Sequence, residues 1–257
     1  MEIKSIAKRS WKRIEFVDFL RGIAVVLMVM YHFFFDLAYF GKIRIESEIF
    51  WFWLPRFIGG LFIFVSGISL TLARIKYGNK LTRVYLRKGA KYFLLGLLIS
   101  ILTLPTGCYV RFGILHFFGV SVILASFFAS LKYLAAFLGV TLIFAGIKLD
   151  EIHVNSESLL WIGIKPVNFC TLDYYPLLPW LGIMLMGIFA GNSFNFNLKV
   201  PRFFKPITYV GRKSLTIYLL QHPLIIAVMQ AYYGDVIQQI LSTVFSWKNK
   251  HFNFCIF

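Results

Sequence analysis

The stretch VDFLRGIAVVLMVMYHFFFDLAYF, residues 17–40, is an apolar run that carries four ionisable side chains, Asp18, Arg21, His32 and Asp36. Its length suits a helix that crosses a bilayer, which needs about 20 apolar residues. At about 100° per residue, the step from Arg21 to His32 comes within about 20° of three full turns, and Asp36 follows one turn later. Ionisable groups in hydrocarbon usually face a bundle interior or a watery cavity, so the stripe predicts a functional site. Hydrogen bonds that serve only helix packing are the alternative.

The composition of the whole chain predicts an all-α, polytopic membrane protein. Hydrophobic residues make up 59% of the 257 residues, and the mean hydropathy is +0.74, both well above the values of soluble domains. Apolar runs recur along the chain, so we expect a transmembrane helical bundle of about seven or eight spans. The expected spans are 23–40, 51–72, 89–104, 112–129, 133–147, 177–190 and 215–231, with a partial element at 236–247.

No linker, low-complexity tract or internal repeat divides the sequence, so we expect one transmembrane domain over residues 17–247. A basic N-terminal segment, 1–16, would precede it, and a tail, 248–257, would follow. The basic N-terminal segment is followed by a span that contains Arg21 and His32, whereas a cleavable signal peptide would have a short apolar region and a cleavage site there. We therefore expect the first span to be retained.

The formal net charge of +16 is explained by membrane topology. Basic residues cluster before the first expected span, after the second and before the seventh, whereas acidic residues concentrate in the intervening loops 41–50 and 148–175. This pattern predicts a multi-pass protein of the cell membrane with a cytoplasmic N-terminus, whose basic loops meet the anionic headgroups of the lipid bilayer. We expect no nucleic-acid partner, because the chain has no basic, aromatic-bearing soluble module.

Three cysteines, Cys108, Cys170 and Cys255, lack the spacing of metal ligands such as CxxC, so we expect no metal site. The expected topology places Cys108 and Cys170 in external loops. An oxidising compartment would permit a disulfide between them, but we expect free thiols.

Several motifs spread along the chain resemble those of one membrane acyltransferase family. They are DFLRGIAVVLMVMYHFFFDL at 18–37, FIFVSGISL at 62–70, GILHFFG at 113–119, LLPWLGIMLMGIFAG at 177–191 and GRKSLTIYLLQHP at 211–223. In this order and spacing they resemble the heparan-α-glucosaminide N-acetyltransferase catalytic-domain-like family, from about Arg13 to His222. The spacing of Arg21 and His32 is also similar to the signature of the wider acyltransferase-3 superfamily.

The resemblance implies an enzyme that moves an acyl group, most simply acetyl, from acyl-CoA to a hydroxyl or amine of a sugar or glycan. Acyl-CoA and the sugar-containing acceptor would be its substrates, with no tightly bound cofactor. One feature departs from the family. Eukaryotic members carry an essential histidine in the loop after the first span, and residues 41–50 contain none. The role of base therefore reaches His32 only through the superfamily motif.

The chemistry of the residues agrees with that implication. Histidine exchanges protons near neutral pH, so His32 is the candidate base. Asp36 at i+4 is placed to orient the ring of His32, or else to cap or pack the helix end. Arg21, with Asp18 beside it, is the candidate donor site, where a guanidinium binds phosphate. Its alternatives are an ion pair with Asp18 alone or contact with lipid headgroups.

At about 1.5 Å rise per residue, Arg21 and His32 are separated by about 16 Å along the helix. This spacing suggests transfer across the membrane, from a cytoplasmic donor to an acceptor that approaches from outside. Candidates for the wall of the substrate cavity lie elsewhere in the chain. They are His116, His222, Gln221, Arg111, Ser66 and Asp173. Pro223 would free a backbone carbonyl near Gln221 and His222, where such groups either line a cavity or are satisfied by a neighbouring polar side chain.

Two other classes of function remain open. A proton-coupled transporter would use Arg21, His32 and Asp36 as a relay, although the sequence shows no internal repeat of the kind many transporters have. A non-catalytic partner subunit would make the titratable groups incidental. Binding of coenzyme A discriminates among the three.

Overall fold

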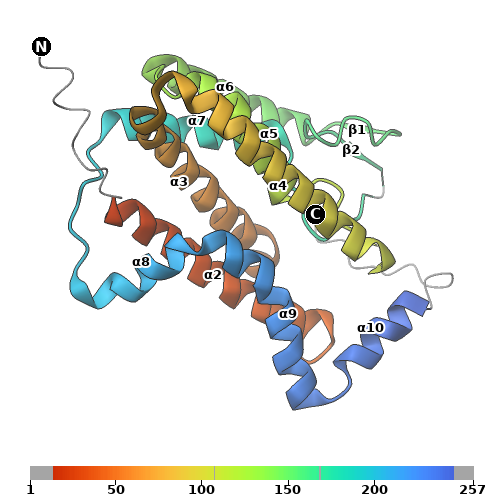
Figure 1. Cartoon of the computed structure of the whole chain (residues 1–257). Coiled ribbons are helices and arrows are strands. Elements are labelled where there is room, and N and C mark those ends of the chain that lie inside the picture. Colours follow the sequence, from red (N-terminus) through yellow and green to blue (C-terminus); the bar gives the residue numbers. More distant parts are fainter. Residues whose placement is uncertain (1–13, 107, 168, 246–257) are drawn as a thin grey trace, which may run out of the picture.

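The computed structural model describes residues 14–106, 108–167 and 169–245 as a bundle of α-helices (Figure 1). The helices are α2 (Glu15–Tyr39), α3 (Leu54–Tyr77), α4 (Leu81–Thr103), α5 (Ile114–Phe128), α6 (Lys132–Leu149), α7 (Leu177–Ser193), α8 (Lys205–Arg212), α9 (Ser214–Tyr233) and α10 (Val236–Phe245). A π-helical turn, η1 (Ile49–Trp53), precedes α3, and 3-10 turns lie at η2 (Gly78–Lys80), η3 (Leu104–Thr106) and η4 (Arg202–Phe204). Two short parallel strands, β1 (His153–Val154) and β2 (Lys165–Pro166), pair within the loop between α6 and α7.

A helix covers most of each expected span. Four segments of the described chain are long and apolar enough to cross a membrane: Glu15–Tyr39, Ile49–Thr103, which holds both α3 and α4, Lys132–Leu149 and Ser214–Tyr233. The apolar helices α5 and α7 are shorter, with 15 and 17 residues. Our expected number of seven or eight spans is therefore not confirmed, whereas the helical membrane class agrees with the structure.

Two boundaries differ from expectation for local reasons. α2 begins at Glu15, not at residue 23, because Glu15 and Asp18 stand in its first turn, where carboxylates interact favourably with the helix dipole. The partial element expected at 236–247 is the ten-residue helix α10, too short to cross a bilayer of about 30 Å. Residues 246–247 lie outside the described part of the chain.

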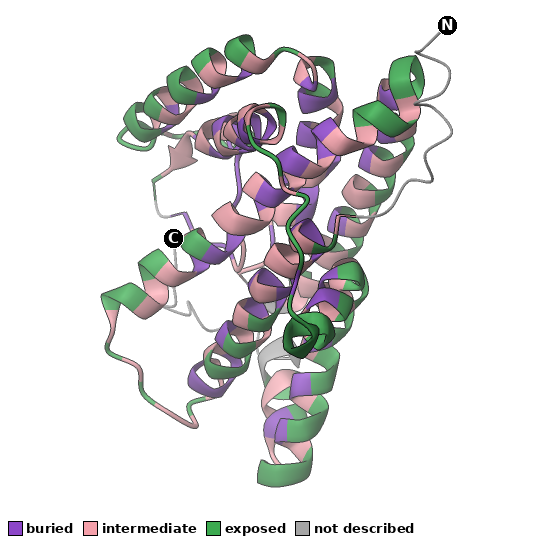
Figure 2. Ribbon diagram, turned by 90° about the vertical axis from the view of Figure 1, so that its left-hand side faces the viewer, coloured by how far each residue is buried: buried purple, intermediate pink, exposed green. Residues whose placement is uncertain are grey.

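The helices pack around α3, which lies between α2 on one side and α7 on the other. α6 covers α7, α4 pairs with α5, and α8 and α9 lie against α2 (Figure 1). The largest buried cluster joins α3, α5 and α7 through Ile63, Leu70, Phe117, Met184 and Ile188. Figure 2 shows buried residues where helices face one another and exposed residues along their outer sides. Many of these exposed residues are large and apolar, as lipid-facing side chains are.

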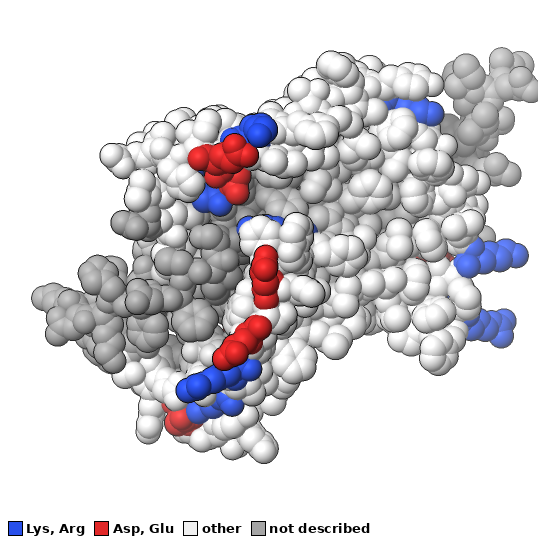
Figure 3. Space-filling view, turned by 180° about the vertical axis from the view of Figure 1, so that it is seen from behind, with Lys and Arg blue, Asp and Glu red and all other residues white. Residues whose placement is uncertain are grey.

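The connections between helices gather at two ends of the bundle. We call one the basic end; it holds the first turns of α2, the turn between α3 and α4, and α8. We call the other the disulfide end, because there Cys108 and Cys170 link the loop before α5 to the loop before α7. Figure 3 shows the acidic side chains gathered at one end together with several basic ones, a broad and largely uncharged belt, and basic side chains at the other end.

The disulfide corrects the expectation of free thiols. The loops that carry Cys108 and Cys170 are held together by neighbouring contacts: the backbone of Phe112 bridges to Tyr174, and the hydroxyl of Thr171 donates to the carbonyl of Tyr109 at 3.0 Å. These contacts bring the two Cα atoms to 5.5 Å, within the range that a disulfide requires. Sequence alone does not show that pairing, because 62 residues separate the two cysteines.

Candidate functional site

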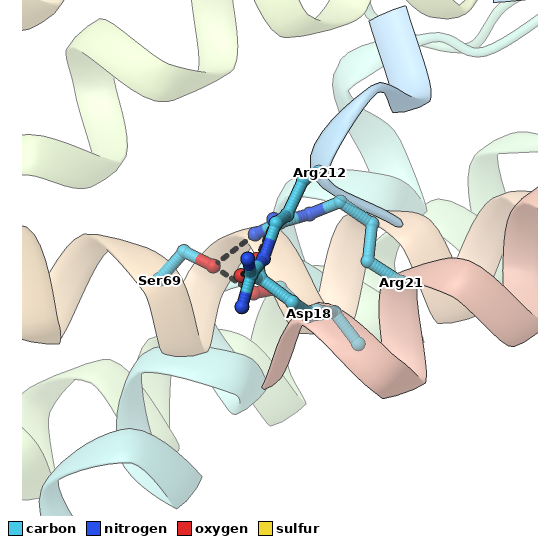
Figure 4. A network of polar contacts seen from close by, with 5 residues as sticks. Asp18, Arg21, Ser69 and Arg212 are labelled. Atoms are coloured by element: carbon cyan, nitrogen blue, oxygen red, sulfur yellow. Dashed lines mark hydrogen bonds and ion pairs between the residues drawn. The ribbon is translucent and has the colours of Figure 1, made fainter. Parts of the chain in front are cut away.

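Asp18 is the centre of a polar network at the basic end (Figure 4). Its side chain is buried, at 4% exposure. Oδ1 accepts a hydrogen bond from Nη1 of Arg21 at 2.9 Å, and Oδ2 accepts one from Nε of Arg212 at 3.2 Å. Nη2 of Arg21 also donates to Oγ of Ser69 on α3 at 2.6 Å. Two guanidinium groups thus converge on one buried carboxylate.

Close approach of α8 to α2 makes this network possible. Gly211 lies against the backbone of Asp18, and a Cβ at Gly211 would collide with the carbonyl oxygen of Asp18. Gly22 meets the carbonyl of Ile207 in the same way. The glycines therefore let the two backbones touch, and Arg212, which follows Gly211, reaches the carboxylate.

A second cluster lies further along α2, where α9 packs against it near the disulfide end. Nδ1 of His222 on α9 lies 3.0 Å from Oδ2 of Asp36 on α2. The ring of His222 packs edge-on against the ring of His32, with 4.6 Å between their centroids. Asp36 is buried at 5% exposure, whereas the side chain of His222 is 43% exposed. The cluster thus joins a buried carboxylate to two imidazoles, one of which reaches the surface.

Gln221 completes the cluster with polar atoms that lack partners. Its side chain is 3% exposed and lies beside His32. Among the described residues, Nε2 and Oε1 of Gln221 and the buried Nδ1 of His32 make no hydrogen bond of good geometry, although His32 lies within reach of the Gln221 amide and of the Met28 backbone. Unpaired buried polar atoms cost free energy, so their concentration at one place indicates a site that a ligand or water satisfies.

The predicted stripe on α2 contributes residues to both clusters. The contacts that these residues make differ from our expectation. We expected Asp36 to orient His32, and the carboxylate instead holds His222. His222 reaches the carboxylate because α9 packs against α2, although 186 positions separate His222 from Asp36 in the sequence. Arg21 does pair with Asp18, the alternative that the sequence left open, and it also binds Ser69.

Asp173 lies at the disulfide end and caps α5. Its Oδ2 accepts the backbone N–H of Ile114 at 2.8 Å, in the first turn of that helix. Burial raises the pKa of Asp173 to about 6, and the charge of nearby His222 acts in the opposite direction. Asp173 is therefore close enough to the cluster of His32, Asp36 and His222, which we call the histidine cluster, for their charges to interact.

The other predicted cavity residues make contacts away from that cluster. Nδ1 of His116 accepts the N–H of Gly113 at 3.3 Å, and its ring packs against Phe93 and Phe112. Arg111 pairs with Glu157, although its buried Nε has no partner among the described residues. No hydrogen bond of Ser66 is seen within the described part of the chain. The structure brings Gln221, His222 and Asp173 toward His32, and it does not bring His116, Arg111 or Ser66 into contact with it.

Two further residues, Ser69 and Arg212, escaped the sequence interpretation. Ser69 and Arg212 belong to motifs already noted, but nothing local distinguishes them from their polar neighbours. The hydroxyl of buried Tyr175 donates to the carbonyl of Pro55 at 2.8 Å and so ties the start of α3 to the start of α7. Within the described residues, no group of three or more His, Cys, Asp or Glu side chains is placed to hold a metal ion.

A comparison with protein families gives one match. The family model described as heparan-alpha-glucosaminide N-acetyltransferase, catalytic, matches residues 13–223. The match ends directly after Gln221 and His222, so it contains both clusters. No curated protein and no solved structure matched the chain.

Proposed function

The chain belongs to the heparan-alpha-glucosaminide N-acetyltransferase catalytic family, and from this we propose that it transfers an acyl group from acyl-CoA to a sugar-containing acceptor. The family implies a membrane enzyme of the acetyltransferase type. Acetyl-CoA is thus the proposed donor, and a sugar hydroxyl or amine is the proposed acceptor. The observation that carries the proposal is the Asp36–His222–His32 cluster beside the unpaired amide of Gln221.

In our proposal the basic end receives the donor. Arg21 and Arg212 supply guanidinium groups, which bind phosphates through paired hydrogen bonds. Arg212 also lines a surface pocket of about 180 Å³ together with Glu15, Lys205, Thr208 and Tyr209. Asp18 holds both arginines in place, and a phosphate would offer them further oxygen acceptors.

The histidine cluster is the proposed site of transfer. The acceptor oxygen or nitrogen attacks the thioester carbonyl carbon, and His32 takes the proton on a ring nitrogen. The carbon–sulfur bond then breaks, and the coenzyme A thiolate leaves and receives the proton. The amide N–H of Gln221 is a candidate donor to the carbonyl oxygen as that oxygen gains negative charge. When neutral His222 donates Nδ1–H to Asp36, its Nε2 is left as a second proton acceptor.

The two clusters suggest transfer across the bilayer. Arg21 and His32 lie on the unbroken helix α2, about 16 Å apart along its axis. The basic end would face the cytoplasm under the positive-inside rule, which places the protein in the cell membrane with an internal N-terminus. A cytoplasmic donor would then extend its pantetheine arm toward His32, and the acceptor would enter from the disulfide end.

Calorimetric titration of the full chain in nanodiscs with acetyl-CoA tests the donor assignment. We expect saturable binding that Arg21→Ala weakens and that Arg74→Ala, an exposed charge at the same end, leaves unchanged. Coenzyme A without its 3′-phosphate reports whether that phosphate is bound. Absence of binding at millimolar donor would overturn the transferase proposal and make the transporter the leading hypothesis. Transfer of labelled acetyl to a panel of sugars, with His32→Ala as control, then identifies the acceptor.

A further inference from the structure

An apolar groove runs along the outer face of the bundle between α4 and α5. Its volume is about 440 Å³. The residues that line it are all apolar and include Leu86, Gly89, Phe93, Leu94, Gly119 and Ile123. The glycines bring the helices together, since a Cβ at Gly89 would meet the carbonyl of Gly119. Leu86 and Leu94 are 55% and 65% exposed, so the groove opens onto the lipid-facing surface.

Arg83 and Arg87 lie on α4 next to the residues that line this groove, toward the basic end. Both are exposed, and neither has an ion-pair partner among the described residues. In a helix, Arg83, Arg87, Ala90 and Leu94 follow one another at steps of four, three and four residues and therefore lie on one face. The hydroxyl of Ser126 donates to Thr82 at 3.4 Å, which places the end of α5 beside this part of α4. Positively charged side chains thus lie beside the apolar groove.

We propose that the groove binds one acyl chain of an anionic phospholipid whose phosphate lies against Arg83 and Arg87. From Arg83 to Leu94 the helix rises about 16 Å, close to half of the about 30 Å hydrocarbon thickness. A chain that starts at the headgroup level would therefore follow the groove to the middle of the membrane. Basic side chains at the membrane surface attract anionic lipids, and a phosphate accepts bidentate hydrogen bonds from arginine.

Charge also argues against a second copy of the chain as the occupant. In a dimer with its two-fold axis along the groove, Arg83 and Arg87 of one copy would lie opposite the same two residues of the other copy. Like charges placed opposite one another are unfavourable in an interface. This inference is independent of the proposed transferase activity.

Native mass spectrometry of the full chain in detergent tests the proposal, with phosphatidylglycerol and phosphatidylcholine of identical acyl chains as probes. We expect the wild type to bind phosphatidylglycerol about tenfold more tightly, the equivalent of about 1.4 kcal/mol. Arg83→Gln with Arg87→Gln should abolish this preference. Arg74→Gln with Lys76→Gln removes the same charge from the end of α3 and should leave the preference intact.

A second variant locates the acyl chain. Ala90→Phe fills the groove from an exposed position, so it should weaken binding of both lipids while the protein stays monodisperse and keeps its unfolding temperature. Equal affinity of the wild type for the two lipids would overturn the proposal. So would equal losses in the two charge variants, wild-type lipid binding by Ala90→Phe, or a dimer that Ala90→Phe dissociates without any effect on lipid binding.

Discussion

Oδ2 of Asp36 and Nδ1 of His222 lie 3.0 Å apart, although 186 positions separate the two residues in the sequence. At the basic end, Asp18 on α2 binds Arg212, the last residue of α8, at 3.2 Å. Two buried carboxylates of α2 therefore hold the consecutive helices α8 and α9 against it, Asp18 through Arg212 and Asp36 through His222. This arrangement aligns the proposed donor end with the proposed site of transfer.

Asp36→Asn should lower kcat for acyl transfer by about 10²- to 10⁴-fold, because the amide no longer fixes the tautomer of His222. The same loss is expected for His222→Gln, and the double variant should be no slower than either single one. Asp235→Asn is the matched control. Its carboxylate is also at the disulfide end but pairs with Lys42. Additive losses in the double variant would show that Asp36 and His222 act separately.

Arg212→Gln should raise KM for acyl-CoA by about 10- to 100-fold with a smaller effect on kcat, since a charge-assisted hydrogen bond contributes about 1.5–3 kcal/mol. Steady-state kinetics in proteoliposomes measures both constants. Arg202→Gln removes an exposed charge from η4 and serves as control. An unchanged KM, with kcat reduced, would remove Arg212 from the donor site.

Replacement of Cys108 and Cys170 by serine should lower the free energy of unfolding by about 2–4 kcal/mol, because the disulfide restricts the unfolded chain across a loop of tens of residues. Thermal unfolding in detergent with and without reductant measures the effect. Reductant should lower the unfolding temperature of the wild type and leave that of the double serine variant unchanged. Equal sensitivity of the two proteins to reductant would mean that the bond does not stabilise the fold.

Asp173 should make the stability of the protein depend on pH between about 4 and 6. Burial raises its pKa in the folded protein to about 6 from an ordinary value of 3.8, so the folded state binds the proton more tightly than the unfolded state. The stabilisation is complete below the unfolded pKa and is lost as pH rises through about 6. From pH 7.5 to pH 5, the unfolding temperature of the wild type should therefore rise relative to that of Asp173→Asn. Parallel curves for the two proteins would contradict this expectation.

Much of the candidate site is predictable because it follows one helix. The positions of Asp18, Arg21, His32 and Asp36 on a common stripe depend only on helical periodicity, and Pro223 marks the neighbourhood of Gln221 and His222. The ion pair of Arg21 with Asp18 was among the alternatives, but the partners that come from other helices were not predictable. Ser69 and Arg212 look like ordinary polar residues of their segments until α3 and α8 are placed against α2.

The sequence by itself determined the helical membrane class, the approximate positions of the helices and the family. Hydrophobic content and local backbone hydrogen bonding decide those properties, and both are encoded within windows of about 20 residues. Only the tertiary structure decided that Asp36 holds His222, that Arg212 joins Asp18 and Arg21, and that Cys108 bonds to Cys170. Such contacts depend on how close two helices approach, and that distance is set by side chains and glycines from remote segments.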